Sequence, residues 1–432
     1  MLGLCRPGEL VRWTGPEPFA DLIFPLDFGG SDDHGRNPVT SAPVKVLVVG
    51  AGIGGLCLAQ GLLRRGVDVA VYERDAALES RGQGYRLHLD AGAALHSCLA
   101  PDLYQLCVAT AGRPSTSVTV VTKRLRRLRQ FDTGGPSDPS DPATLSTSVN
   151  RLTFREILAA RLDGVIEYGR ACTRFEQDHD GVRVFFADGA SAQGDVLVGA
   201  DGVGSVVRRR YLPHAQVIPT GSLCVYGRTP LTTESRPLIP GYLWHGFTAV
   251  VGSGVGMATG VLDFREEPVA AAARIAPDVR LSAVPGYLMW ALTGPAARFA
   301  RPPAPELSAA ALHRVALDTT RRWHRDVRKL VELATVAETT LVPIRTSVPV
   351  GRWLPSRVTL LGDAIHAMSP ARGSGANTAL RDAALLAAEL GAAAFGDKSV
   401  LAAVADYERE MRDYGFAAVR ANQHAEWADR AR

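Results

Sequence analysis

The sequence predicts an α/β fold, because a short apolar strand runs into a glycine-rich turn at three places along its 432 residues. The turns begin at Gly50, Gly199 and Gly362, and a helical pattern of residues can follow each of them. From about residue 218 the pattern changes to strand-like pieces broken by proline and glycine, which is typical of an antiparallel sheet. We therefore expect an α/β domain built from separate segments, with a mostly antiparallel domain between them.

The first turn carries a recognisable motif. Val44–Val49 is a nearly continuous apolar run, as expected for a strand buried on both faces. Gly50, Gly52 and Gly55 follow in the spacing G-x-G-x-x-G, and the next strand ends at Glu73, about 20 residues on. These glycines permit a tight turn, a close approach of pyrophosphate and close helix packing, and the acid can bind ribose hydroxyls. The stretch predicts a dinucleotide site; the alternative is a glycine-rich turn that binds nothing.

The second turn follows a predicted buried strand at Val196–Val198 and contains Asp201 and Gly202. The chain can enter a helix from Val206 onward. Two strand–turn–helix units in one chain suggest a single dinucleotide that is held from two sides.

The third turn begins at Gly362 and Asp363, directly after the predicted strand Arg357–Leu361. A glycine loop then leads to a helix predicted over Thr378–Leu390, with Asn377 as its N-cap. A glycine loop that feeds a helix N-terminus is a second site suited to an anion.

Two groups of arginines are candidates for binding a charged ligand. Arg151 and Arg155 are one turn apart on the predicted helix Val149–Ala160, and such a pair shares a face. Arg81 lies in a glycine-containing loop where we expect the cofactor. The alternative for each is a side chain that faces water.

The remaining elements are predicted from their periodicity. We expect one strand over residues 117–131 and one helix over Leu307–Leu333, with Trp323 and Leu330 toward the core. The Gly252–Gly256 stretch predicts a hairpin rather than a second nucleotide site, because the chain continues as strand. A last amphipathic helix is expected over about 399–428, with an apolar side formed by Leu401, Val404, Met411 and Tyr414.

Composition excludes several classes of function. The net charge of +4 is too small to argue for a nucleic-acid or membrane partner, and no apolar run is long enough to span a bilayer. No signal peptide is recognisable, so we expect a cytoplasmic protein. The six cysteines form no C-x-x-C pair, so neither a disulfide framework nor a metal site is predicted. The basic run at residues 123–129 predicts a solvated edge strand or loop, with a phosphate-binding patch as the alternative.

Taken in order, the three motifs resemble those of the single-component FAD-dependent aromatic hydroxylases, the para-hydroxybenzoate-hydroxylase-like flavoprotein monooxygenases. The resemblance covers residues 44 to 420. It implies non-covalent FAD, with NAD(P)H and O2 as co-substrates. No W-x-W-x-I-P is present, which disfavours a flavin halogenase, and no C-x-x-x-x-C pair is present, which excludes a disulfide reductase.

The resemblance assigns cofactor-binding roles to the three turns and to the arginines near them. The first turn would hold the ADP part of FAD, Asp363 would contact the ribityl chain, and the glycine loop after it would lie beside the flavin ring. The residues implied are Gly50, Gly52, Ile53, Gly54, Gly55, Glu73, Arg74, Arg81, Arg151, Arg155, Asp201, Gly202, Gly362, Asp363, Pro370, Gly373, Gly375, Ala376 and Asn377.

The resemblance does not reach the substrate. Five residues of the antiparallel domain could line a pocket or could equally be sheet core: Tyr226, Arg228, Trp244, His245 and Trp290. No catalytic acid or base is predicted. An aromatic or polyketide-like small molecule from secondary metabolism, such as antibiotic biosynthesis, is the expected substrate.

The expected architecture is an extension over residues 1–43, an FAD-binding domain over 44–217 and 345–395, a substrate domain over 218–344, and a C-terminal helix over 396–432. The expected activity is hydroxylation or Baeyer–Villiger insertion of one oxygen atom. Two alternatives remain: a non-redox cyclase of the same fold that keeps FAD as a structural part, and a flavin-binding or regulatory protein without turnover.

Overall fold

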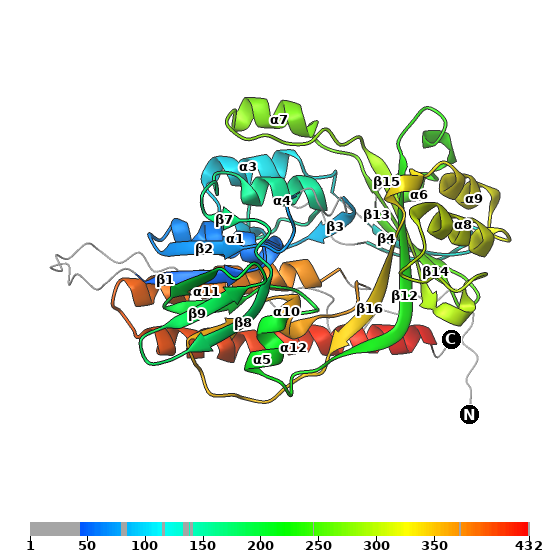
Figure 1. Cartoon of the computed structure of the whole chain (residues 1–432). Coiled ribbons are helices and arrows are strands. Elements are labelled where there is room, and N and C mark those ends of the chain that lie inside the picture. Colours follow the sequence, from blue (N-terminus) through cyan, green and yellow to red (C-terminus); the bar gives the residue numbers. More distant parts are fainter. Residues whose placement is uncertain are drawn as a thin grey trace. The chain divides into compact units, whose positions relative to one another are not determined.

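A five-stranded parallel sheet forms the centre of the α/β part (Figure 1). Its neighbouring strands run parallel. In the central strand Val46, Leu47 and Val48 are fully buried, as expected for a strand covered on both faces. The strand order is β17 (Val358–Leu360), β11 (Val196–Gly199), β1 (Lys45–Val49), β2 (Asp68–Tyr72) and β7 (Ile166–Glu167). The predicted α/β fold is confirmed.

This computed structural model describes residues 44–78, 84–114, 117–132, 138, 141–244, 246–370 and 373–430, with the side chains of the last helix described to residue 423. All of them belong to one unit, Ser41–Arg432. The predicted extension over residues 1–43 lies outside the described residues.

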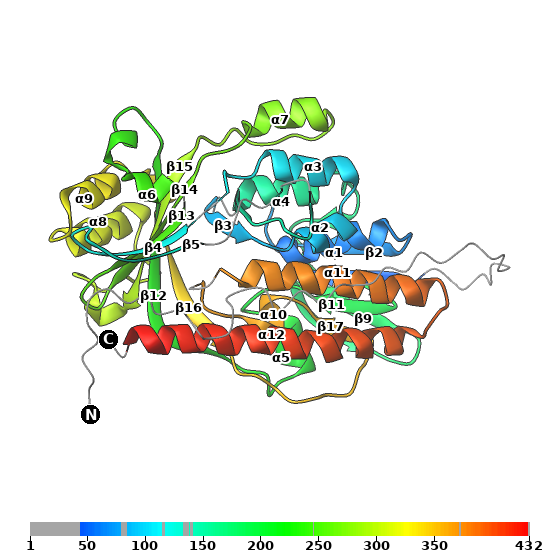
Figure 2. The same ribbon diagram turned by 180° about the vertical axis from the view of Figure 1, so that it is seen from behind.

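Helices pack around the parallel sheet, and α11 lies between α1 and α12 (Figure 2). Gly61 of α1 lets α11 come close, because a Cβ there would lie 2.9 Å from the Cβ of Ala387. The helices of this part are α1 (Ile53–Leu63), α2 (Gly92–Cys98), α3 (Pro101–Ala109), α4 (Arg151–Ala159), α5 (Val206–Tyr211), α10 (Asp363–His366), α11 (Gly375–Ala394) and α12 (Val400–Arg430). None of the described helices is long and apolar enough to cross a membrane.

A seven-stranded sheet forms the second part and is antiparallel except for the pair β13–β4. Its order is β16 (Thr340–Ser347), β12 (Val217–Pro230), β15 (Tyr287–Pro295), β14 (Gly256–Leu262), β13 (Gly246–Val251), β4 (Ser117–Thr122) and β5 (Arg127–Asp132). Its short helices are η3 (Arg236–Leu238), α6 (Gly241–Trp244), η4 (Ala296–Arg298), α8 (Ala309–Thr320), α9 (Arg325–Glu332) and η5 (Val336–Glu338).

The strand predicted over residues 117–131 is two strands, β4 and β5, so that prediction is wrong in its count. The turn between them holds Leu125 at a φ of +59°. Leucine rarely adopts this left-handed conformation, so the sequence pattern does not predict a turn here. Both strands join the seven-stranded sheet although they lie within residues 44–217. The boundary predicted at 217/218 therefore does not separate the two sheets. Every residue of β5 is exposed at the sheet edge, as the solvated interpretation of the basic run predicted.

The single helix predicted over Leu307–Leu333 is also divided, into α8 and α9. His324 is the N-cap of α9 and accepts a hydrogen bond from the Asp326 N–H, which explains the new start. Leu401 of the last helix is exposed rather than part of its apolar side. The hairpin predicted around Gly252–Gly256 is confirmed as the antiparallel pair β13–β14.

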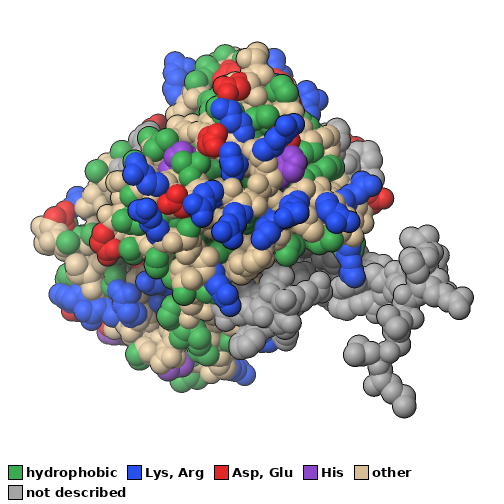
Figure 3. All heavy atoms as spheres, turned by 90° about the vertical axis from the view of Figure 1, so that its right-hand side faces the viewer, with side chains coloured by type: hydrophobic (Ala, Val, Ile, Leu, Met, Phe, Trp, Pro, Cys, Tyr) green, Lys and Arg blue, Asp and Glu red, His purple; other side chains and the backbone are tan. Residues whose placement is uncertain are grey.

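Two small sheets and one excursion complete the fold. The three-stranded sheet contains β8 (Cys172–Gln177), β9 (Val182–Phe186) and β10 (Ser191–Gly194), and the two-stranded sheet pairs β3 (Arg86–Leu89) with β6 (Thr147–Asn150). Helix α7 (Pro268–Ile275) leaves the seven-stranded sheet and packs against α3. Figure 3 shows that lysine and arginine side chains greatly outnumber acidic ones on the face that carries α8 and α9.

Candidate active site

The first turn has the geometry that a phosphate-binding turn needs. Gly50 adopts a φ of +113°, and a Cβ on Gly55 would lie 2.1 Å from the Gly50 carbonyl oxygen. Gly52 is the N-cap of α1, makes no side-chain cap, and would place a Cβ with no atom within 4 Å. The helix N-terminus therefore stands beside open space at Gly52, where an anion can approach the backbone.

The next two residues of the motif join the first turn to the third. Ile53 is half-buried, and a Cβ on Gly54 would lie 2.4 Å from Cδ2 of Leu361 and 3.2 Å from Cβ of Ala379. Only glycine at position 54 lets α1 pack this closely against the end of β17 and the start of α11.

Two charged residues hold the backbone of the first turn. The carboxylate of Glu73 is buried and accepts hydrogen bonds from the N–H groups of Ala51, at 2.8 Å, and Asp75, at 3.0 Å. Arg155 is buried and donates to the carbonyl oxygens of Ala51, at 3.0 Å, and Leu78, at 3.2 Å. Burial lowers the pKa of Arg155. Both residues thus fix the shape of the turn as well as lying beside it.

The second turn brings Asp201 to the start of α5. One carboxylate oxygen accepts from the Val206 N–H at 2.6 Å, and the other is buried with no partner among the described residues. Gly202 follows at a φ of +75°. Arg208 belongs to a basic run whose sequence predicts a solvated face, but it is buried and donates to the Ala364 carbonyl oxygen at 2.8 Å. It therefore ties the second turn to the third.

The third turn exposes one acid. Gly362 adopts a φ of +64°, and its N–H donates to Asp382 at 2.8 Å. Asp363 is exposed, although the residues on either side of it are buried. The surrounding protein raises the pKa of the Asp363 carboxyl, and His366 and Arg151 oppose this effect. Protein atoms therefore partly desolvate this carboxyl, but the residue remains accessible to solvent.

A buried network that the sequence analysis missed supports the third turn. Nε2 of His366 lies 2.6 Å from one oxygen of Asp382, and the Tyr414 hydroxyl donates to the other at 2.6 Å. Burial lowers the pKa of His366, but the Asp382 carboxylate raises it, and the net shift is upward. The signal in the sequence was an acid within an Ala/Leu helix, because such a residue needs a buried partner.

The start of α11 differs from the prediction. The helix begins at Gly375 after the N-cap Ser374, which makes no side-chain cap, so the prediction of Asn377 as N-cap is wrong. The side chain of Asn377 instead accepts from the Asp90 N–H at 3.0 Å and donates to the His88 carbonyl oxygen at 3.1 Å. It therefore fastens the first turn of α11 to β3.

The loop before α11 is held at several points. The Gly373 N–H donates to the Pro370 carbonyl oxygen at 3.0 Å, and Gly373 adopts a φ of +66°. A Cβ on Gly373 would lie 3.4 Å from Cβ of His88, so this loop also contacts β3. Asn422 of α12 donates to the Ser374 hydroxyl at 2.9 Å. Ala376 is half-buried in the first turn of the helix.

Two of the remaining predicted arginines have different partners. Arg74 is exposed, with Nε 3.9 Å from Asp75. Arg151 is half-buried, and its guanidinium carbon lies 5.5 Å from the centre of the Tyr85 ring. Arg81 lies outside the described residues.

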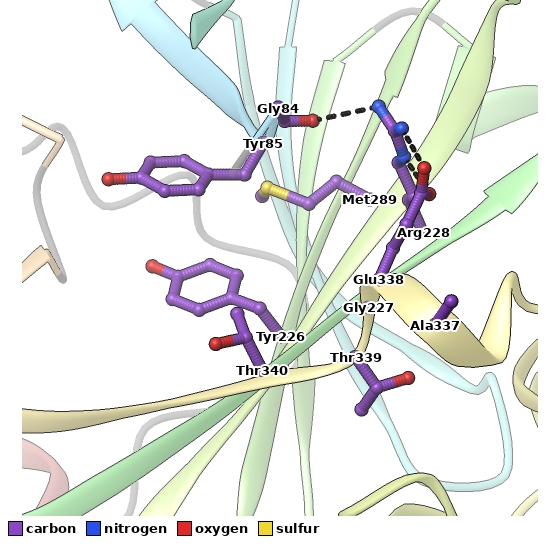
Figure 4. Close-up of a pocket in the computed structure, with 10 residues that line it drawn as sticks. All are labelled: Gly84, Tyr85, Tyr226, Gly227, Arg228, Met289, Ala337, Glu338, Thr339 and Thr340. Atoms are coloured by element: carbon purple, nitrogen blue, oxygen red, sulfur yellow. Dashed lines mark hydrogen bonds and ion pairs between the residues drawn. The ribbon is translucent and has the colours of Figure 1, made fainter. Parts of the chain in front are cut away.

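A cavity of about 250 Å³ opens between the residues before β3, the middle of the seven-stranded sheet and the turn into β16 (Figure 4). Tyr226 and Arg228, both predicted from the sequence, line it. The described lining is Gly84, Tyr85, Tyr226, Gly227, Arg228, Met289, Ala337, Glu338, Thr339 and Thr340.

Two tyrosines form one wall of the cavity. The rings of Tyr85 and Tyr226 stack with their centres 5.3 Å apart and 17° between their planes. Their hydroxyls point to the same side, away from Arg228 and Glu338 (Figure 4). Burial raises the pKa of Tyr226 well above its usual value, so its phenol stays protonated and can donate a hydrogen bond.

An ion pair forms the opposite wall. Nε and Nη2 of Arg228 each donate to a carboxylate oxygen of Glu338, and Nη1 donates to the Gly84 carbonyl oxygen at 3.1 Å. The amide nitrogen of Asn150 also donates to this carbonyl oxygen, at 3.2 Å, and to the Tyr287 hydroxyl, at 3.0 Å. Glu338, Tyr85 and Asn150 were not predicted, because their roles depend on contacts between distant segments.

Two other predicted substrate residues, Trp244 and Trp290, do not belong to the described lining. Trp290 is fully buried in the core of the seven-stranded sheet, and a Cβ on Gly227 would lie 2.1 Å from its ring. Trp244 is half-buried and donates to the Ile239 carbonyl oxygen at 3.3 Å. His245 lies outside the described residues.

Comparisons with known proteins agree with this geometry. The model of an NAD(P)-binding Rossmann-like domain matches residues 48–108, around the first turn, and that of an FAD binding domain matches residues 311–422, around the third. The FAD-dependent monooxygenase thnD of Trichoderma harzianum is 28% identical over 405 residues, which cover 89% of this chain and 93% of thnD. In sequence and fold the chain is therefore similar to FAD-dependent monooxygenases and hydroxylases, in agreement with the resemblance to the para-hydroxybenzoate-hydroxylase-like family.

Other FAD-dependent monooxygenases are also similar over most of the chain. The dual O-methyltransferase/FAD-dependent monooxygenase elcB of Phaeosphaeria nodorum is 33% identical over 371 residues, 79% of this chain and 39% of elcB. The chain spans 39–44% of the length of such dual-function relatives. The crystal structure of Klebsiella pneumoniae HpxO with FAD and uric acid superposes with a TM-score of 0.69 at 26% identity, covering 88% of this chain and 87% of HpxO.

The residues present fit FAD. The space beside Gly52 admits a pyrophosphate, and two helices, α1 and α11, begin without side-chain caps. Asp363 is exposed between buried neighbours, and Asp201 has a buried oxygen without a partner among the described residues. These groups offer positive helix ends to phosphate and acceptors to hydroxyls, which is the set that a flavin dinucleotide requires.

Proposed function

We propose that the protein uses FAD, NAD(P)H and O2 to insert one oxygen atom into an aromatic or polyketide-like small molecule, by hydroxylation or Baeyer–Villiger insertion. One observation carries this proposal: the loop expected beside the flavin ring and the wall of the cavity are bonded together. Asn377 binds the backbone of β3, and Gly84 and Tyr85, directly before β3, line the cavity. A ring bound there would lie next to the predicted flavin site.

Each part of the site has a separate task in this proposal. The start of α1 would bind the pyrophosphate, Glu73 a ribose, and Asp363 the ribityl chain. The uncapped start of α11 would present its partial positive charge to the flavin ring and so favour negative charge there. When bound, FAD supplies hydride acceptance from NAD(P)H and the reaction with O2. The protein orients the substrate and excludes water.

We infer further that residues 44–217 and 345–395 make up the FAD-binding domain except for β4, β5 and the end of β16, which join residues 218–344 in the substrate domain. The helix in 396–432 packs against α11 of the FAD-binding domain.

The proposed partners are a small-molecule substrate and O2, with no nucleic acid and no membrane. A cytoplasmic location is supported by the free cysteines Cys57, Cys98, Cys107, Cys172 and Cys224. A role in antibiotic biosynthesis is part of the same proposal. Because the relatives named above are monooxygenases, the comparisons do not favour the cyclase.

The purified protein should be yellow, and its flavin should be reduced by NADPH. In anaerobic mixing, we expect bleaching that a bound phenol or ketone accelerates, recovery of colour with O2, and a product one oxygen atom heavier. Denaturation and filtration should release the flavin, which checks that it is non-covalent. A flavin that stays oxidised with every ligand that binds, while a ligand is isomerised without O2, would instead establish the cyclase.

Replacing Glu73 or Asp363 with alanine should weaken FAD binding. Each change removes a charge-assisted hydrogen bond worth about 1.5–3 kcal/mol, which corresponds to a tenfold or larger rise in Kd. Glu73→Gln should lose less than Glu73→Ala, because its amide oxygen can still accept from the Ala51 N–H. FAD dissociation constants of the folded variants give the answer, with Glu176→Ala, an exposed acid on β8, as control. Constants equal to the wild-type value would remove both residues from the site.

A further inference from the structure

Among the described residues, the charge at the surface of the cavity is neutralised by an ion pair. Arg228 and Glu338 are the only charged residues among the ten that the structure places in its lining. Every guanidinium nitrogen of Arg228 has a protein acceptor: Nε and Nη2 donate to Glu338, and Nη1 donates to the Gly84 carbonyl oxygen. The side chains are 20% and 29% exposed, so the pair lies at the cavity surface with limited access to water.

The rest of the lining is apolar or carries neutral polar groups. Tyr85 and Tyr226 offer ring faces and hydroxyls, and Met289 offers a thioether between them and Arg228 (Figure 4). Thr340 is half-buried, and its side chain lies on the same side as Tyr226 (Figure 4). Such a lining can stack on an aromatic ring and exchange hydrogen bonds with hydroxyl or carbonyl groups.

Two further arginines lie near the cavity but are directed elsewhere. The guanidinium of Arg151 lies over the ring of Tyr85, and its charge interacts with the Asp363 carboxyl. Arg86 is buried, and its side chain lies within 3.2 Å of the position of a Cβ on Gly260. Neither residue belongs to the described lining.

We propose that this cavity selects a neutral, hydroxylated aromatic ring system and rejects aromatic carboxylates, because Glu338 already forms an ion pair with the guanidinium of Arg228. This inference rests on the proposed function, whose substrate class it narrows. An aromatic carboxylate would lose its hydration beside the Glu338 carboxylate, which repels it, and would find three of the five N–H donors of Arg228 already engaged. A phenol or quinone has no charge to desolvate and can bond to the tyrosine and threonine hydroxyls. Glu338 is thus a specificity-determining residue.

The size of the cavity agrees with such a ligand. Its volume of about 250 Å³ lies below the ~300–1,000 Å³ that is usual for drug-sized ligands. One or two fused rings are therefore the best match to the enclosed part.

The test compares 1-naphthol with 1-hydroxy-2-naphthoate on the FAD-loaded full chain at pH 7.5. Isothermal titration should give a naphthol Kd at least about tenfold below that of the acid. In Glu338→Gln, where Arg228 regains donors, the acid should gain about tenfold or more while naphthol changes little. Glu332→Gln removes the same charge from the surface pair with Arg328 on α9 and should change neither constant.

Several outcomes would overturn the inference. They are tighter wild-type binding of the acid, binding of neither probe, or an unchanged ratio of the two constants in a folded Glu338→Gln. The wild-type ratio alone decides the question if that variant does not fold. Because titration needs no turnover, the result is independent of the redox test: turnover of acids alone would overturn the inference and leave the proposed function intact.

Discussion

Gly52→Ala should release FAD without unfolding the protein. Gly52 lies at a φ of −77° and a ψ of 179°, which alanine adopts without strain, and the new Cβ would meet no protein atom within 4 Å. The methyl group would instead occupy the space through which the pyrophosphate reaches the backbone. Overpacking of this kind costs about 1–3 kcal/mol, so the Kd for FAD should rise by about 5- to 140-fold.

Gly55→Ala is the matched comparison, because it changes the same residue type three positions along the helix. Its Cβ would lie 2.1 Å from the Gly50 carbonyl oxygen, so the turn itself must move. We expect this variant to lose both FAD and stability. Urea unfolding of the FAD-free proteins, together with FAD titration, separates the two cases. A Gly52→Ala protein that keeps wild-type affinity would show that no phosphate approaches this turn.

Glu408→Gln should make the protein more stable at pH 8 and remove part of its pH dependence. Glu408 is buried on α12 beside Thr359 of β17. Burial raises the pKa of its carboxyl from 4.5 to about 7, although the Thr359 hydroxyl, which donates to it at 2.8 Å, opposes the shift. The folded state therefore holds a proton that the unfolded state releases between pH 4.5 and 7.

The sign of the effect follows from this difference. Since the folded state binds more protons in that interval, stability falls as the pH rises from 4.5 to 7. The rise in the pKa of Glu408 from 4.5 to about 7 corresponds to about 3 kcal/mol of folding stability lost above pH 7. This is the largest gain in stability that we expect from Glu408→Gln. Urea unfolding at pH 5 and pH 8 measures it. Glu410→Gln, an exposed neighbour on the same helix, is the control, and equal pH slopes in wild type and Glu408→Gln would contradict the assignment.

The sequence was sufficient for the local units of the fold. The strand, turn and helix around Gly50 could be predicted because their signals lie within about 30 residues: apolar runs, glycine spacing and one acid. The hairpin at Gly252–Gly256 was predictable for the same reason. Cofactor chemistry also depends on these short motifs, so they were sufficient to predict an FAD site.

Contacts between distant segments could not be predicted. Glu338 pairs with Arg228 across 110 residues, and Asn377 bonds to Asp90 across 287. Nothing in the alternating pattern of β4 indicates that it pairs with β13. Trp290 and Tyr226 are both aromatic residues in strands, and only the direction of each side chain places one in the core and the other in the cavity.

The order of the strands in the parallel sheet has a consequence for synthesis of the chain. β11 ends at Gly199, but its neighbour on the far side, β17, begins only at Val358. At about 5–20 residues per second, a ribosome needs roughly 10–30 s to make the intervening segment. During that time β11 has an unpaired edge, and the loop and helix that complete the flavin site do not yet exist. Flavin capture is therefore confined to the last stage of translation or to the released chain.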